Sequence, residues 1–148
     1  MVKPFSPGQE EEISNLISSV FHEFIGFEYT EEGNKVFNDF ISPENILERY
    51  KNGNIVLTFQ QDESIIGIIE VRDNNHISLF FVGKKHHNNG IGKTLLNEIV
   101  SMLKGKTDIL TVNASPFSEK IYSKFGFERS GEKTEKNGII FIPMRMTL

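Results

Sequence analysis

Two glycines stand in a segment whose composition suits anion binding. Residues 87–94 read His-Asn-Asn-Gly-Ile-Gly-Lys-Thr, directly after an apolar run from Ile77 to Val82. Apolar residues then recur at helical spacing, at Leu95, Leu96, Ile99, Val100 and Leu103. The order predicts a strand, a glycine loop and a helix. Glycines at a helix start let backbone N–H groups approach an anion, and the helix end adds about half a positive charge. The segment therefore predicts a phosphate-binding loop.

The loop resembles two nucleotide-binding motifs, but it lacks a required glycine of each. A Walker A loop ends in Gly-Lys-Thr, as residues 92–94 do, but it needs its first glycine where His87 stands. A dinucleotide-binding fingerprint needs a third glycine where Leu95 stands, and no acidic residue ends a suitable next strand. A small nucleoside triphosphatase is therefore the weaker enzymatic alternative.

The N-terminal third predicts helices. Ser6-Pro7-Gly8-Gln9 resembles a helix start with Ser6 as N-cap and Gln9 closing a capping box, and apolar residues then recur at helical spacing. A second helix is expected from Ser42-Pro43. The stretch from Gly26 to Phe40 between them is expected to be irregular.

The remainder predicts a mixed sheet. Residues 55–60, 64–72 and 76–82 indicate an antiparallel meander, followed by a helix over about 90–104. A strand over 109–113, a helix over 116–125 and two strands over about 127–135 and 139–147 follow, the last two joined at Asn137-Gly138. Antiparallel strands with one crossover helix indicate an α+β fold.

Two blocks together resemble the GNAT superfamily of N-acetyltransferases. Residues 82–96 are similar to its acyl-CoA loop, Gln/Arg-x-x-Gly-x-Gly/Ala, with Gly90 and Gly92 in place. His87 stands where Gln or Arg is usual, and Lys84 where Pro is common. The second block, Asn113-Ala114 followed by residues 121–127, is similar to the family's downstream Asn-Ala…Tyr-x-Lys-x-Gly-Phe segment.

The resemblance covers nearly the whole chain and implies a fold and an activity. The fold would be one GNAT domain over residues 1–148, with about six or seven mainly antiparallel strands, splayed central strands and about four flanking helices. The activity would be transfer of an acetyl group from acetyl-CoA to a primary amine of a small molecule or peptide by direct attack. A non-catalytic acyl-CoA-sensing module on the same fold is the alternative.

The resemblance also implies how the co-substrate is held. Loop amides from about Asn88 to Lys93 would hold the pyrophosphate of coenzyme A. The pantetheine arm would lie between the splayed strands and pair with the backbone of residues 80–82. N–H groups near Phe81 and Val82 would polarise the thioester carbonyl. The implied contacts are Phe80, Phe81, Val82, His87, Asn88, Asn89, Gly90, Ile91, Gly92, Lys93, Thr94 and Asn113.

Three residues are catalytic candidates. The family uses a tyrosine at the place of Tyr122 to protonate the leaving thiolate, and a phenol's reference pKa near ~10 suits that transfer. The general base in several members lies eleven or nine residues before the Gln/Arg position, which gives His76 and Ser78 here. Imidazole favours His76, and Glu70 on the neighbouring strand is the rival.

The acceptor site is expected to be built by the Gly26–Phe40 stretch and the closing hairpin. Phe27, Glu28 and Tyr29 could line a pocket there. Glu28 with Glu31 and Glu32 would attract a cationic amine.

Composition limits the classes of protein and of partner that remain. The 148 residues are 38% hydrophobic and 24% charged, which is typical of a soluble globular domain. The net charge of −4 argues against nucleic-acid partners, and no apolar run suits a membrane span or signal core. The chain has no cysteine, and His86 beside His87 lacks a third ligand, so no metal is expected. A cytoplasmic monomer or homodimer is the expectation.

Overall fold

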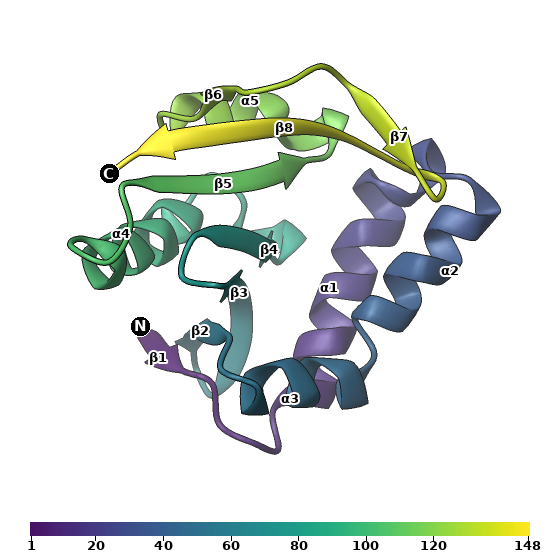
Figure 1. Cartoon of the computed structure of the whole chain (residues 1–148). Coiled ribbons are helices and arrows are strands. Elements are labelled where there is room, and N and C mark those ends of the chain that lie inside the picture. Colours follow the sequence, from purple (N-terminus) through teal and green to yellow (C-terminus); the bar gives the residue numbers. More distant parts are fainter.

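A computed structural model describes residues 1–148 as one open sheet with helices on both faces (Figure 1). The strands are β1 (Val2–Pro4), β2 (Ile55–Gln61), β3 (Ser64–Arg72), β4 (His76–Val82), β5 (Ile109–Ala114), β6 (Glu128–Arg129), β7 (Thr134–Lys136) and β8 (Ile139–Thr147). The helices are α1 (Glu10–Phe24), α2 (Glu31–Phe40), α3 (Pro43–Lys51), α4 (Ile91–Leu103) and α5 (Glu119–Lys124). Short 3₁₀ turns are η1 (Gly26–Glu28), η2 (Lys84–His86) and η3 (Pro116–Ser118).

The strands follow the order β1-β2-β3-β4-β5-β8-β6, with β7 also paired to β8. Every neighbouring pair is antiparallel except β4 and β5, which α4 connects as parallel strands. The predicted α+β class, its mainly antiparallel sheet and its antiparallel meander are confirmed.

The central strands separate soon after they meet. β4 pairs with β5 only at His76 with Thr111 and Ile77 with Val112, although β4 continues to Val82 and β5 to Ala114. Figure 1 shows the two strands diverging toward the side of α1 and α2. The expected splay of the central strands is confirmed.

A β-bulge at Ser78 lies where this separation starts. The β3–β4 register pairs Glu70 with Leu79 and Val71 with Ile77, so Ser78 is the extra residue on β4. Ile77 therefore packs in the core under α4, while Leu79 packs in the core under α1 and α3. Because of the bulge, Ile77 and Leu79 lie on opposite faces of the sheet, although two residues that are two positions apart in a regular strand share one face.

Two apolar cores hold the layers. One joins the sheet to α4 and α5 and includes Leu95, Ile99, Leu110 and Phe127. The other joins the opposite face to α1 and α3 and includes Ile13, Ile17 and Ile46. These cores fix the two walls on either side of the gap. No helix is both long and apolar enough to cross a membrane.

Two predictions near the N-terminus were wrong. The Gln9 side chain does accept a hydrogen bond from the Ser6 N–H at 2.9 Å, but Gly8 has φ +109° and α1 begins only at Glu10. The stretch expected to be irregular contains α2. Its start has a sequence signal, because the Thr30 hydroxyl caps it by accepting from the Gly33 N–H at 3.1 Å.

The closing strands also differ from the prediction. The stretch expected as one strand over 127–135 forms two short strands, β6 and β7, which both pair with β8. The Asn137-Gly138 turn forms as expected, with both residues at positive φ.

Candidate functional site

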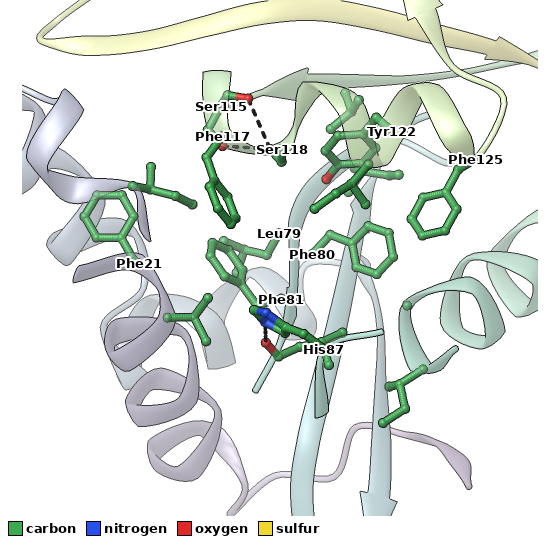
Figure 2. Close-up of a pocket in the computed structure, with 18 of the residues that line it drawn as sticks. Phe21, Leu79, Phe80, Phe81, His87, Ser115, Phe117, Ser118, Tyr122 and Phe125 are labelled. Carbon is green, nitrogen blue, oxygen red and sulfur yellow. Dashed lines mark hydrogen bonds between the residues drawn. The ribbon is translucent and has the colours of Figure 1, made fainter. Parts of the chain in front are cut away.

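A pocket of about 620 Å³ occupies the gap between β4 and β5. Sixteen of its 27 lining residues are hydrophobic, so its wall is mainly apolar. Figure 2 shows α1 on one side, α4 on the other, β4 below and the η3–α5 segment above. The splay of the sheet therefore creates a concave site of a size that suits a small ligand.

The α4 end of the pocket presents free backbone donors. Gly90 is the N-cap at φ +77°, a left-handed conformation that favours glycine, and no side chain caps the helix. The first intrahelical bond runs from the Thr94 N–H to the Gly90 carbonyl at 3.0 Å. The N–H groups of Ile91, Gly92 and Lys93 precede that bond and are free for an anion. These three residues line the pocket.

His87 ties the loop to the end of β4. Its Nε2 lies 2.7 Å from the Val82 carbonyl oxygen, and a carbonyl only accepts, so Nε2 carries the hydrogen. The imidazole also packs against Phe24 at 5.5 Å between ring centroids. His87 therefore fastens the glycine loop to the end of β4. Its unusual place in the motif did not predict this contact.

Backbone groups of β4 line the gap in alternation. Gly83 donates its N–H to the Ile66 carbonyl of the β3 side at 2.8 Å. In the antiparallel register, the backbone N–H and C=O groups of Phe81 therefore also point toward β3. The N–H and C=O groups of Phe80 and Val82 point the opposite way, toward the gap. The Val82 carbonyl is the one His87 occupies. Of the three expected backbone contacts, Phe81 thus differs, because its polar groups face the neighbouring strand.

Tyr122 brings a hydroxyl to the middle of the pocket. It lies on α5, is 7% exposed, and its ring meets Phe80 at 6.0 Å and Phe127 at 5.4 Å between centroids. Its hydroxyl oxygen points into the pocket (Figure 2). Burial raises the pKa of this phenol, so it is protonated at neutral pH. The position suits a proton donor.

The other expected cofactor contacts divide between the pocket and its outside. Asn113 lines the pocket from β5, and Asn88 lines it from the loop. Asn89 is exposed and not part of the lining. Thr94 is also outside, with its hydroxyl bonded to the Gly90 carbonyl at 2.9 Å.

The structure does not bring Glu70 to the pocket. Its side chain is fully buried and accepts hydrogen bonds from Arg49 Nε at 2.7 Å and Asn54 Nδ2 at 2.8 Å. The Arg49 guanidinium lies over the Phe40 ring at 3.7 Å from the centroid. Glu70 thus joins β3 to α3, and its expected role as a general base stays a prediction that this placement does not support.

His76 also lies outside the lining. Its Nδ1 lies 2.7 Å from the Thr111 hydroxyl, across the β4–β5 pairing. Burial first, and then the charge of Arg72, lowers the pKa of His76 to about 4. The imidazole is therefore neutral at pH 7, but it faces its strand neighbour and not the pocket. His76 lies at the junction of β4 and β5, and its expected role as a general base stays a prediction that this placement does not support.

The acidic residues expected at the acceptor site do not line the pocket. Glu31 and Glu32 are exposed in the first turn of α2, and Glu28 lies outside the lining. Phe27 is 75% exposed and also outside, whereas Tyr29 does line the pocket.

Several wall residues were not singled out from the sequence as site residues. They are Phe21, Phe117, Ser115 and Ser118, while Phe37 belongs to the expected acceptor stretch and Ser78 to the two positions considered for the general base. Ser78 has a buried hydroxyl without a hydrogen-bond partner, and Ser115 and Ser118 bond to each other at 2.7 Å. Phe21 and Phe37 lie on helices with ordinary apolar spacing, so no local pattern separates them from core residues. Their role depends on the gap they face.

Comparisons with known proteins show that this fold is shared with solved structures. Solved structures of similar fold include a GCN5-related N-acetyltransferase from Rhodopseudomonas palustris, with TM-score 0.86, 18% identity and coverage of 100% of this chain and 95% of that one. The PaiA N-acetyltransferase from Thermoplasma acidophilum, solved with coenzyme A, has TM-score 0.82, 22% identity and coverage of 100% and 98%. An aminoglycoside 6'-N-acetyltransferase from Enterococcus faecium has TM-score 0.73, 14% identity and coverage of 99% and 96%.

The sequence itself gives the family. Residues 27–148 match the acetyltransferase (GNAT) domain. That match contains the glycine loop, both splayed strands and Tyr122. This chain belongs to the GNAT family of acetyltransferases.

Proposed function

We propose that this protein is an acetyl-CoA-dependent N-acetyltransferase that acts on a primary amine by direct attack. The observation that carries the proposal is the pocket between the splayed strands, with free helix N–H groups at one end and the Tyr122 hydroxyl in its middle. The related structure from Thermoplasma acidophilum holds coenzyme A, which supports this choice of co-substrate.

The residues present fit coenzyme A. The free N–H groups of Gly92 and Lys93 suit its pyrophosphate, since they combine with the positive end of α4. The gap-facing backbone of Phe80 and Val82 suits the amides of a pantetheine arm. Asn113 offers an amide from the opposite strand.

Acetyl-CoA would supply an activated acetyl thioester. For this chemistry the chain contributes position, polarisation and a proton. A gap-facing N–H of β4 can donate to a carbonyl oxygen without any rearrangement of the strand. The Tyr122 hydroxyl holds a proton on the opposite wall. The burial that raises the pKa of Tyr122 also raises the pKa of a thiol beside it. The pKa values of the proton donor and the acceptor thus shift in the same direction, which keeps the proton transfer between them favourable.

Binding and turnover together test the proposal. Titration calorimetry should show binding of acetyl-CoA and coenzyme A, and none of ATP. Turnover can be followed by the release of free thiol with a thiol-specific reagent, because the chain has no cysteine of its own to react. Binding of ATP alone would overturn the proposal. Binding of acetyl-CoA without thiol release across a panel of amines would favour a sensing module.

A further inference from the structure

Aromatic rings enclose the end of the pocket away from α4. Phe21 and Phe117 stand on the α1 side of Figure 2, with Leu79 and Phe81 of β4 beneath them. Phe21 is fully buried and Phe117 is 40% exposed. This part of the wall, which we call the aromatic end, is formed by Phe21, Ile25, Tyr29, Phe37, Phe81 and Phe117.

Four of these rings, those of Phe21, Tyr29, Phe37 and Phe81, form a continuous packed surface. Phe21 stacks on Phe37 with centroids 4.0 Å apart and 17° between planes, and Phe37 lies 6.1 Å from Phe81. Tyr29 meets Phe21 edge-on at 5.2 Å. Such an enclosure favours a flat aromatic or aliphatic group over a charged one.

No carboxylate lines any part of the pocket. Its charged side chains are two lysines, Lys93 and Lys124. Burial, and secondarily the charge of Glu28, raises the pKa of Tyr29 to about 12, so its phenol stays neutral. A second ammonium group on an acceptor would therefore meet no carboxylate in the pocket wall, which makes its burial unfavourable.

From this wall we infer that the acceptor is a primary amine on an aromatic or aliphatic body with no second positive charge. The inference rests on the proposed N-acetyltransferase function and names the substrate class of the same pocket. The neutral amine nitrogen forms a bond to the thioester carbonyl carbon as the carbon–sulfur bond breaks. One amine proton is lost and one is gained by sulfur, giving an amide and free coenzyme A. The structure thus disfavours polyamine and aminoglycoside acceptors.

A matched pair of amines tests the inference. n-Pentylamine and 1,4-diaminobutane have the same number of heavy atoms and differ in a terminal methyl or ammonium group. We expect kcat/KM for n-pentylamine to exceed that for 1,4-diaminobutane at least tenfold, with 2-phenylethylamine at least equal to n-pentylamine. A second readout is calorimetric binding of each amine to the enzyme saturated with coenzyme A, which should rank the amines in the same order.

A charge-introducing variant tests the wall itself. Phe117→Glu places a carboxylate at the aromatic end from a partly exposed position, so the fold should tolerate it. The ratio of kcat/KM for 1,4-diaminobutane to that for n-pentylamine should rise at least tenfold. Phe27→Glu is the matched control, because Phe27 is exposed and outside the pocket, and its ratio should equal that of the unaltered protein.

The possible results distinguish a wrong substrate class from a wrong proposal of N-acetyltransferase activity. Equal or better use of 1,4-diaminobutane by the unaltered protein would overturn the inference and leave N-acetyl transfer intact. A ratio unchanged in Phe117→Glu while the variant still binds coenzyme A would also overturn it. Absence of thiol release with every amine would instead overturn the proposed function, and the inference with it.

Discussion

Tyr122 combines a position inside the pocket with a phenol that burial keeps protonated. Tyr122→Phe removes only the hydroxyl, because the ring keeps its contacts with Phe80 and Phe127. We expect kcat to fall about a hundredfold, the lower range for loss of a general acid. The dissociation constant of acetyl-CoA, measured by calorimetry, should stay within about twofold. An unchanged kcat would remove Tyr122 from the proposed chemistry.

Glu70 forms a buried ion pair with Arg49, and we expect its role to be structural. Glu70→Gln leaves the Arg49 charge without its partner and should lower the free energy of unfolding by about 2 kcal/mol, somewhat less than for a fully buried pair because Arg49 is 19% exposed. Urea unfolding measures the loss. The pH profile of kcat should keep its shape.

A double variant makes the Glu70 prediction sharper. In Glu70→Gln combined with Arg49→Met the unpaired charge is gone, so much of the stability should return. A pH profile that loses its lower limb in Glu70→Gln alone would contradict the structural role and restore Glu70 as a base.

The edge of β4 is the element on which the co-substrate site depends. Amide hydrogen exchange can examine it one residue at a time. The N–H of Phe81 faces β3 and should be protected with or without ligand, whereas those of Phe80 and Val82 should gain protection when coenzyme A is added. Equal protection of all three N–H groups before and after addition would show that the arm binds elsewhere.

The start of α4 is the second such element. Gly90→Ala forces a side chain into φ +77° with open space around it, so the cost is backbone strain of about 1–2 kcal/mol, not a clash. We expect at least a tenfold weaker affinity for coenzyme A, measured by calorimetry. Gly105→Ala, at φ +82° after α4, is the matched control and should lose similar stability with unchanged affinity.

Element order was predictable because its signals are local. The strand–glycine–helix segment, the Asn137-Gly138 turn and the Ser42-Pro43 helix start each depend on a few neighbouring residues. The α2 helix was not predicted, although Thr30 and the two glutamates that follow it mark its start. The aromatic residues of this stretch favoured the prediction of a loop.

The candidate site was predictable only where it belongs to one segment. The α4 loop and Tyr122 line the pocket as expected. His76 and Glu70 were selected by their positions in the sequence, whereas Thr111 of β5 and the partly buried Arg49 of α3 decide what they contact. Contacts across the splayed sheet have no local sequence signal.

At the scale of the whole molecule, the two parts of the sheet meet through a very short junction. β4 and β5 share two residue pairs, and the His76–Thr111 hydrogen bond lies at this junction. The pKa of His76 falls from 6.5 to about 4 on folding. Below pH 6.5 the unfolded chain therefore binds a proton that the folded chain excludes, so the contribution of His76 to stability is complete above pH 6.5 and is lost progressively down to about pH 4.

The loss should be visible as a pH dependence that a variant removes. Between pH 7 and pH 4 the free energy of unfolding should fall by about 1–2 kcal/mol more in the unaltered protein than in His76→Asn, a value reduced from the full conversion because the ring is partly exposed. Asparagine can still bond to Thr111 and does not titrate, so it isolates the imidazole. Parallel pH curves for the two proteins would contradict the prediction. A junction that weakens on acidification would also admit solvent between β4 and β5, so affinity for coenzyme A should decline over the same pH interval in the unaltered protein and less steeply in the variant.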